Sequence, residues 1–148
     1  MDWKPFIIQA FNYDRWANKQ WISRIGGFKN FDRPYAILEH ILSSQETWLK
    51  RCGAEIYPQT TDMSLVELFD LTTQGWIAVV EGSSFDDPIA YTTSIGNSYV
   101  QPLGHIALHV INHGTYHRGQ LRGLAEADGY TNFPETDLIL YLREDGLK

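Results

Sequence analysis

The sequence contains a single cysteine, Cys52, among 148 residues. One cysteine cannot form an intrachain disulfide, and this suits a reducing compartment. The chain also lacks an apolar run of about 18 residues, the length that a membrane-spanning helix needs. The first residues lack the pattern of a signal peptide. We therefore expect a cytoplasmic protein with no membrane partner.

Basic residues are also scarce. Twelve Lys and Arg stand against 18 Asp and Glu, which gives a net charge of -6. Nucleic-acid binding depends on Lys and Arg that neutralise phosphates, so we expect no nucleic-acid partner. The chain has neither a glycine-rich phosphate loop nor the nucleophile elbow of a serine hydrolase.

The length and the residue types that are present describe an ordinary soluble domain. Apolar residues make up 43% of the chain and charged residues 20%. A chain of this length can bury a sizeable core, and no repeat or linker divides it. We expect one domain over residues 1–148.

Apolar residues recur at spacings of three and four in four long stretches, which is the pattern of amphipathic helices. The stretches are residues 4–25, 32–51, 65–80 and 102–127. Pro34 suits the first turn of the second helix, and Ser64 with Glu67 reads as a capping box before the third. Residues 53–63 read as a loop. The sequence therefore predicts an all-α four-helix bundle.

Two shorter elements complete the prediction. Residues 89–95 are β-branched and aromatic, and residues 98–100 can pair back across Gly96 and Asn97. This pattern indicates a short β-hairpin between the third and fourth helices. A short C-terminal helix is expected from Thr136, a good N-cap residue, to about Arg143.

Four of the five histidines stand four residues apart in the last long helix, at His105, His109, His113 and His117. Residues four apart lie on one face of a helix, so His113 and His117 can offer two ligands to one metal ion. The row turns by about 40° at each step, so all four histidines cannot reach one ion. His40, on the inner or rim side of the second helix, is the obvious third ligand.

Several neighbours have more than one reading. His109 is either a ligand, a group that orients a ligand, or a core histidine. Asn112, Tyr116 and Gln120 are candidates for orienting the ligands, and each is equally plausible as a surface or packing residue. Glu46 is a candidate base or part of a solvated helix face.

Other side chains carry weaker predictions. We expect four aromatic residues in the core: Phe11, Trp48, Trp76 and Tyr99. Tyr13 and Trp16 are candidates for a cleft or dimer face. Arg118 and Arg122 form a candidate carboxylate site, although Arg118 can equally pair with an acidic residue of another element. Cys52 is expected to be a bystander.

Several motifs resemble those of the DinB family, the DinB/YfiT-like metalloenzymes. Residues 109–120, HVINHGTYHRGQ, are similar to the family's last-helix motif. Residues 13–18, residues 40–42 with 48–49, and residues 136–141 resemble its first-helix, second-helix and closing motifs. The resemblance spans nearly the whole chain, and residues 109–120 are its specific part.

The resemblance implies an up-down-down-up bundle with a crossover between the third and fourth helices. It implies a divalent metal ion, zinc or nickel, held by His40, His113 and His117. It also implies a frequent homodimer, and relatives that transfer low-molecular-weight thiols such as bacillithiol or mycothiol, or isomerise substrates with a thiol cofactor. His109 and Asn112 are candidates for supporting the three ligands.

Three functions remain open at this point. The first is a metal-dependent enzyme of the thiol S-transferase type that acts on a small-molecule substrate. The second is a metal-dependent hydrolase that uses metal-bound water. The third is a metal-stabilised, stress-related binding module without enzyme activity.

Overall fold

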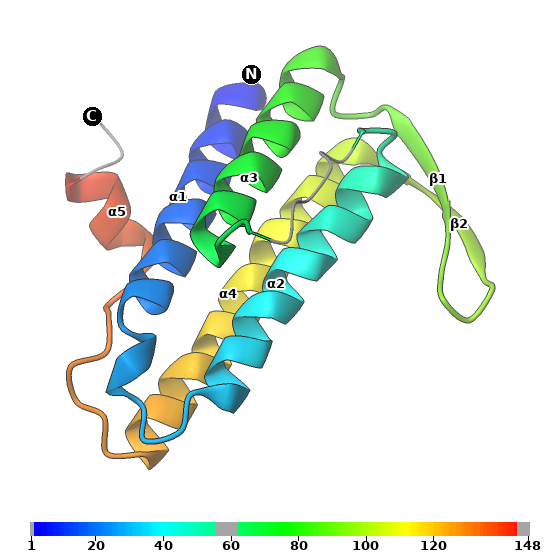
Figure 1. Ribbon diagram of the computed structural model, residues 1–148. Coiled ribbons are helices and arrows are strands. Elements are labelled where there is room, and N and C mark those ends of the chain that lie inside the picture. Colours follow the sequence, from blue (N-terminus) through cyan, green and yellow to red (C-terminus); the bar gives the residue numbers. More distant parts are fainter. Residues whose placement is uncertain (1, 56–61, 145–148) are drawn as a thin grey trace.

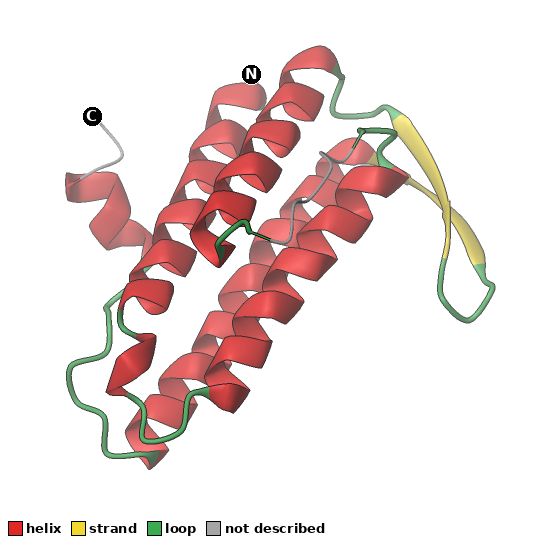
Figure 2. Cartoon of the chain, viewed as in Figure 1, coloured by secondary structure: helices red, strands yellow, loops and turns green. Residues whose placement is uncertain are grey.

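The structure is a computed structural model that describes residues 2–55 and 62–144. Figures 1 and 2 show the long helices side by side, a projecting hairpin and a short C-terminal helix beside α1. The elements are α1 (Lys4–Ser23), η1 (Ile25–Gly27), α2 (Asp32–Arg51), α3 (Leu65–Gly82), β1 (Pro88–Thr92), β2 (Ser98–Pro102), α4 (Leu103–Ala127) and α5 (Leu138–Glu144). The predicted all-α bundle is confirmed. The loop predicted at 53–63 falls partly on residues 56–61, outside the described residues.

The ends of the helices are determined by capping hydrogen bonds and by turn-forming residues next to them. Both halves of the predicted capping box are present: the Glu67 N–H donates to Ser64 Oγ (3.2 Å), and the Ser64 N–H donates to Glu67 Oε2 (2.7 Å). α1 ends two residues earlier than predicted, because the chain tightens into the 3-10 turn η1 at Ile25. Gly53 has φ +80 just after α2, a conformation that favours glycine.

The four long helices run in the up-down-down-up order. α1 is antiparallel to α3, because Lys4 bonds the Glu81 carbonyl near one end while Lys19 bonds Asp70 near the other. α2 is antiparallel to α4, because His40 lies beside His117 and Trp48 lies beside His109. α2 and α3 run in the same direction (Figure 1).

The connection between α3 and α4 crosses the end of the bundle. α1 and α2 each pack against both α3 and α4, which places α3 and α4 at opposite corners. The hairpin lies in this connection, as predicted. The parallel pair α2 and α3 needs a long connection of its own, through residues 52–64.

Two apolar clusters fill the interior on either side of a polar layer. One cluster gathers around Trp21, Leu38 and Phe69, and the other around Phe11, Trp76 and Ile106. Within residues 2–55 and 62–144, the buried polar and charged residues are Asp14, Asn18, Gln45, Thr72, Thr73 and Arg118. A bundle of this size thus contains a charged group in its core, which requires partners for it.

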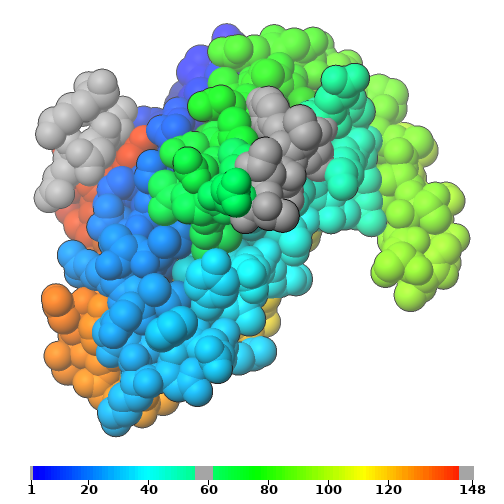
Figure 3. All heavy atoms as spheres, in the orientation of Figure 1, coloured from blue at the N-terminus to red at the C-terminus, as the bar shows by residue number. Residues whose placement is uncertain are grey.

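β1 is shorter and β2 is longer than the sequence suggested, and the hairpin is more exposed. β1 ends at Thr92 rather than residue 95, because residues 93–97 form the turn and the Thr93 N–H bonds the Asn97 carbonyl (2.8 Å). Tyr91 pairs with Tyr99 across the ladder. The hairpin stands out from the body of the molecule (Figure 3), and Tyr99 is 49% exposed. The prediction that Tyr99 belongs to the core was therefore wrong.

α5 begins at Leu138, two residues later than predicted. The Thr136 carbonyl accepts a hydrogen bond from the Tyr13 hydroxyl (2.7 Å), which ties the segment before α5 to α1. The Tyr141 ring lies 5.8 Å from the Tyr13 ring and 5.4 Å from the Trp16 ring. This face of α1 is thus covered by the chain's own C-terminal helix. No helix among the described residues is long and apolar enough to cross a membrane.

Candidate metal centre

Three histidines from two helices meet at one side of the bundle. His40 comes from α2, and His113 and His117 come from successive turns of α4. One ring nitrogen from each lies within 4.8 Å of the other two. The structure thus brings together the three residues that the sequence singled out. His40 is exposed at the rim, while His113 and His117 are half-buried.

The distances suit a tetrahedral ion. His113 Nε2 and His117 Nε2 are 3.1 Å apart, and ligands bound to zinc at 2.0–2.1 Å stand about 3.3 Å from each other. The His40 ring centroid is 5.1 Å from that of His113 and 4.6 Å from that of His117. Three imidazoles in this arrangement fit a divalent metal ion and leave coordination positions for other groups.

Gln120 is the residue that orients a candidate ligand. Its Oε1 lies 2.6 Å from His117 Nδ1. A carbonyl oxygen only accepts, so His117 Nδ1 carries the proton and Nε2 offers its lone pair to the cluster. The sequence offered Gln120 as one of three candidates for this role. The contact has the i, i+3 spacing that lets two side chains meet on a helix.

The other two candidates for that role have different surroundings. The Tyr116 ring packs against the His117 ring at 5.1 Å, with 66% of the residue exposed. Asn112 is exposed and lines a separate hollow with His105, Leu108 and His109. Among the described residues, no hydrogen bond joins Asn112 to the three histidines.

His109 lies next to the cluster rather than within it. Its ring centroid is 5.8 Å from His113 and 5.3 Å from Trp48. Trp48 is half-buried and also contacts Tyr91 of the hairpin at 4.9 Å. The expectation that Trp48 belongs to the core is therefore only partly met, because α2 turns this ring toward the hairpin. Phe11 and Trp76 are buried as predicted.

Burial and mutual repulsion favour the neutral form of two of the candidate ligands, His113 and His40. Burial first, and then repulsion from the nearby rings of His117, His40 and His109, lowers the pKa of His113 to about 4. Burial, then repulsion from His117, also lowers the pKa of His40. A neutral imidazole is the form that binds a metal, so protons do not compete for His113 at neutral pH.

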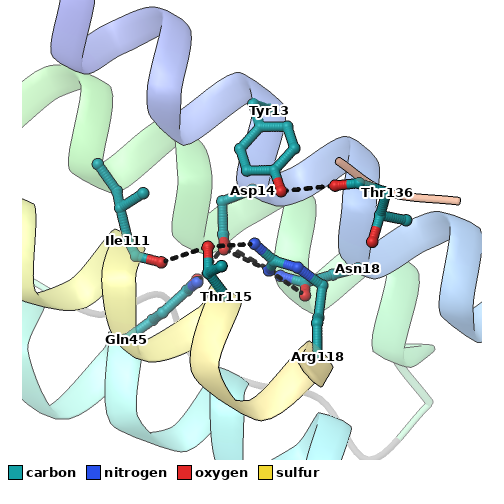
Figure 4. Close-up of polar contacts among 8 residues, drawn as sticks. All are labelled: Tyr13, Asp14, Asn18, Gln45, Ile111, Thr115, Arg118 and Thr136. Atoms are coloured by element: carbon teal, nitrogen blue, oxygen red, sulfur yellow. Dashed lines mark hydrogen bonds and ion pairs between the residues drawn. The ribbon is translucent and has the colours of Figure 1, made fainter. Parts of the chain in front are cut away.

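A buried polar network fixes the turn of α4 that carries His113 and His117 (Figure 4). Arg118 donates to Asp14 Oδ1 (2.6 Å) and Asn18 Oδ1 (2.8 Å) from Nη1, and to Thr115 from Nη2. Gln45 of α2 donates to Asp14 Oδ2 (2.5 Å). The network therefore joins α1, α2 and α4 at the level of the candidate ligands.

The sequence foresaw this network only in part. One of the two predictions for Arg118 was an ion pair with an acidic residue of another element, and the structure shows that this residue is Asp14. The alternative, a carboxylate site shared by Arg118 and Arg122, is wrong, because Arg118 is committed to Asp14 while Arg122 bonds Glu126 and Glu135. The sequence feature that could have predicted the network is the pair Asp14 and Asn18, two polar residues four apart on the otherwise apolar face of α1.

The sequence profile of the DinB family matches residues 6–146. The chain belongs to the DinB family. Members of this family bind divalent metal ions. The chain is similar to Protein DinB of Bacillus subtilis (strain 168), with 23% identity over 162 residues, which cover 93% of this chain and 94% of the relative. No solved structure matches the chain. The chain thus combines the sequence of the DinB family with a three-histidine group that can hold a metal ion.

Proposed function

We propose that this DinB-family protein binds one divalent metal ion, zinc or nickel, at His40, His113 and His117 and acts as a metal-dependent thiol S-transferase. The observation that carries the proposal is the open group of three imidazoles at the rim of the bundle. An ion held there would lower the pKa of a thiol bound to it, so that a thiolate would be available to displace a leaving group from an electrophile.

The chain's own residues support this chemistry. Gln120 holds the His117 ring by its Nδ1. A cavity of about 190 Å³ lies beside the candidate ligands, lined by Arg33, Ile37, His40, His117 and Gln120 among others. Its volume is below the range of most small-molecule sites, so only part of a thiol would fit inside it, and Arg33 offers a cation to a carboxylate on the thiol. His109 and Asn112, one turn and one residue before His113, stay candidates for supporting the site.

The remaining functional expectations are also proposals. We propose a small-molecule substrate, a homodimer and a cytoplasmic location. The hydrolase alternative requires a base beside the metal, and the group of candidate ligand atoms that lie together contains only imidazoles. A free thiol has a much lower pKa than water, so it would need less help from a base once bound to an ion.

Metal analysis of the purified protein tests the site. We expect about one zinc or nickel per chain, lost in both His40→Ala and His113→Ala. His105→Ala is the matched control, because His105 is exposed on the same helix and its ring packs against Phe85. It should keep the metal. Equal metal content in all four proteins would overturn the assignment of the ligands.

Thiol transfer by the metal-loaded protein tests the reaction. Electrophiles such as chlorodinitrobenzene and monobromobimane, each with a panel of low-molecular-weight thiols, should be conjugated faster than by His113→Ala. Hydrolysis of ester substrates without any thiol would favour the hydrolase. Metal-dependent stability without either reaction would favour a binding module.

A further inference from the structure

Two arginines of α2 lie on the helix face that carries His40, one on each side of the three histidines. Arg33 lines the cavity beside His117 and Gln120. Arg51 follows Arg33 by about five turns of an α-helix, so the two side chains leave the helix in the same direction. Their Cα atoms are about 27 Å apart along the axis. A small thiol held at Arg33 therefore cannot also reach Arg51.

The Arg51 guanidinium is fixed by two aromatic rings and lacks a carboxylate partner. Its Cζ lies 4.4 Å from the centre of the Trp48 ring and 5.1 Å from that of Tyr91. Its Nη2 donates to the Thr92 carbonyl of the hairpin (3.4 Å), which stands at this end of α2 (Figure 1). Within the described part of the chain, Arg51 forms no ion pair with an acidic residue. A guanidinium has five N–H donors in a planar fork that matches a carboxylate.

Aromatic rings connect Arg51 with the candidate metal ligands. The Trp48 ring lies 5.3 Å from the His109 ring, which lies 5.8 Å from the His113 ring. His109 is exposed and Trp48 is half-buried. Aromatic side chains bind another ring in offset or edge-to-face geometry. The surface between His113 and Arg51 therefore suits the ring of an aromatic ligand.

The surroundings of Arg51 contain few charges that could neutralise it. The chain has a net charge of -6, yet residues 88–117, which form the hairpin and most of the exposed face of α4, contain no Asp, Glu, Lys or Arg. On α2, the positions between His40 and Arg51 on the same helix face are Ser44, Thr47 and Trp48. The positive charge of Arg51 is thus available to an anion that approaches the three histidines.

We propose that Arg51 binds the carboxylate of the second substrate, an aromatic electrophile, and that Trp48 and His109 hold the ring of this substrate beside the three histidines. The proposal rests on the thiol transferase activity proposed above. His40 and Arg51 are about 16 Å apart along α2, a span that an arginine side chain, an aromatic ring and a thiol cover together.

For an aryl halide, the reaction is a substitution on the ring. The thiolate sulfur forms a bond to the ring carbon that bears the halogen, and the carbon–halogen bond breaks. The halide leaves with the bonding electrons, and the proton of the thiol passes to water. Arg51 takes no part in these bond changes, so its role is to determine which electrophile binds.

Two inert probes test the charge that the site selects. Dinitrobenzoate and dinitrobenzamide share one ring, and only the first carries a carboxylate. Their binding to the purified full chain is followed by ligand-observed ¹H NMR, before and after treatment with a chelator. Dinitrobenzoate should bind at least about tenfold more tightly in both cases. Equal affinity for the two probes would overturn the proposal, and so would a preference that disappears with the chelator.

Arg51→Met and Lys50→Met form a matched pair, because each removes one positive charge from the same turn of α2 and Lys50 is exposed. Arg51→Met should bind dinitrobenzoate at least about tenfold more weakly and dinitrobenzamide as the wild type does. Lys50→Met should bind both probes as the wild type does. Equal losses for both probes in Arg51→Met would show that Arg51 only anchors the hairpin, and this would overturn the proposal.

Trp48→Leu tests where the ring of the ligand lies. It should weaken the binding of both probes several-fold. Unchanged binding of both probes, with the variant folded in thermal unfolding, would overturn this location.

The reactive counterparts separate the site at Arg51 from the reaction itself. With a low-molecular-weight thiol, the wild type should conjugate chlorodinitrobenzoate faster than chlorodinitrobenzamide, and Arg51→Met should lose this preference. If the inert probes bind as expected and neither electrophile is conjugated, the transferase function is wrong while the carboxylate site at Arg51 stands. If both electrophiles are conjugated equally well by the wild type, the transferase function stands and the role of Arg51 is wrong.

Discussion

Arg118 in α4 and Asp14 in α1 form an ion pair of 2.6 Å inside the bundle, with side chains that are 3% and 2% exposed. The pair depends on Gly114, because a Cβ at that position would collide with Asp14 Oδ1. Gly114 and Arg118 each follow a candidate metal ligand in the sequence, His113 and His117. The contact between α1 and α4 therefore fixes the height and rotation of the helix turn that presents both imidazoles.

We predict that Arg118→Met destabilises the protein by about 3–5 kcal/mol, because it leaves the Asp14 carboxylate buried without its cation. Adding Asp14→Asn should restore part of the loss, since the amide keeps the shape of the carboxylate and removes its charge. Urea unfolding of the wild type, both single variants and the double variant measures this. Arg122→Met, which removes two exposed ion pairs, should change stability little. A double variant that is no more stable than Arg118→Met would contradict the prediction.

We predict that Gln120→Ala lowers metal affinity about 10–100-fold, because His117 loses the acceptor that holds its ring. Competition with a chromogenic chelator measures the affinity. Gln74→Ala is the matched control, because Gln74 is exposed on α3. Equal loss in both variants would show that Gln120 has no specific part in the site.

We predict that the metal-free protein loses stability as the pH falls from 6.5 toward 4. The pKa of His113 is about 4 in the folded chain and 6.5 ordinarily, so between these values the unfolded chain binds a proton that the folded chain does not. Protonation therefore favours unfolding over this range. Urea unfolding at several pH values should show a shallower decline in His113→Asn than in the wild type. Parallel curves would mean that His113 titrates alike in both states.

We predict that Cys52 reacts slowly with iodoacetamide at pH 8.5 in the folded protein and rapidly in urea. Burial raises the pKa of its thiol to about 11, and only the thiolate is nucleophilic. Mass spectrometry after timed quenching measures the extent of alkylation. Equally fast alkylation in both states would contradict the burial of this thiol and would reopen its role as a nucleophile.

The regular elements of this fold could be predicted because their causes are local. The capping box at Ser64 and Glu67, Pro34 at a helix start and the row of histidines at intervals of four all act within one or two turns. The ends of the hairpin strands were harder to predict. Gly96 indicated the position of the turn, but hydrogen bonds between Thr93 and Asn97 determined where β1 ends.

The sequence by itself determined which residues share a helix face, and this was enough to nominate His113, His117 and a distant third histidine. Only the tertiary structure decided that Asp14, Gln45 and Arg118 meet in the core, that Trp48 turns toward Tyr91, and that Trp21 and Arg118 share a cavity wall. These contacts join side chains from different helices, and they depend on the relative rotation and height of packed helices. The spacing of residues along one helix is set by its own geometry, whereas the meeting of two helices is set by how all four pack together.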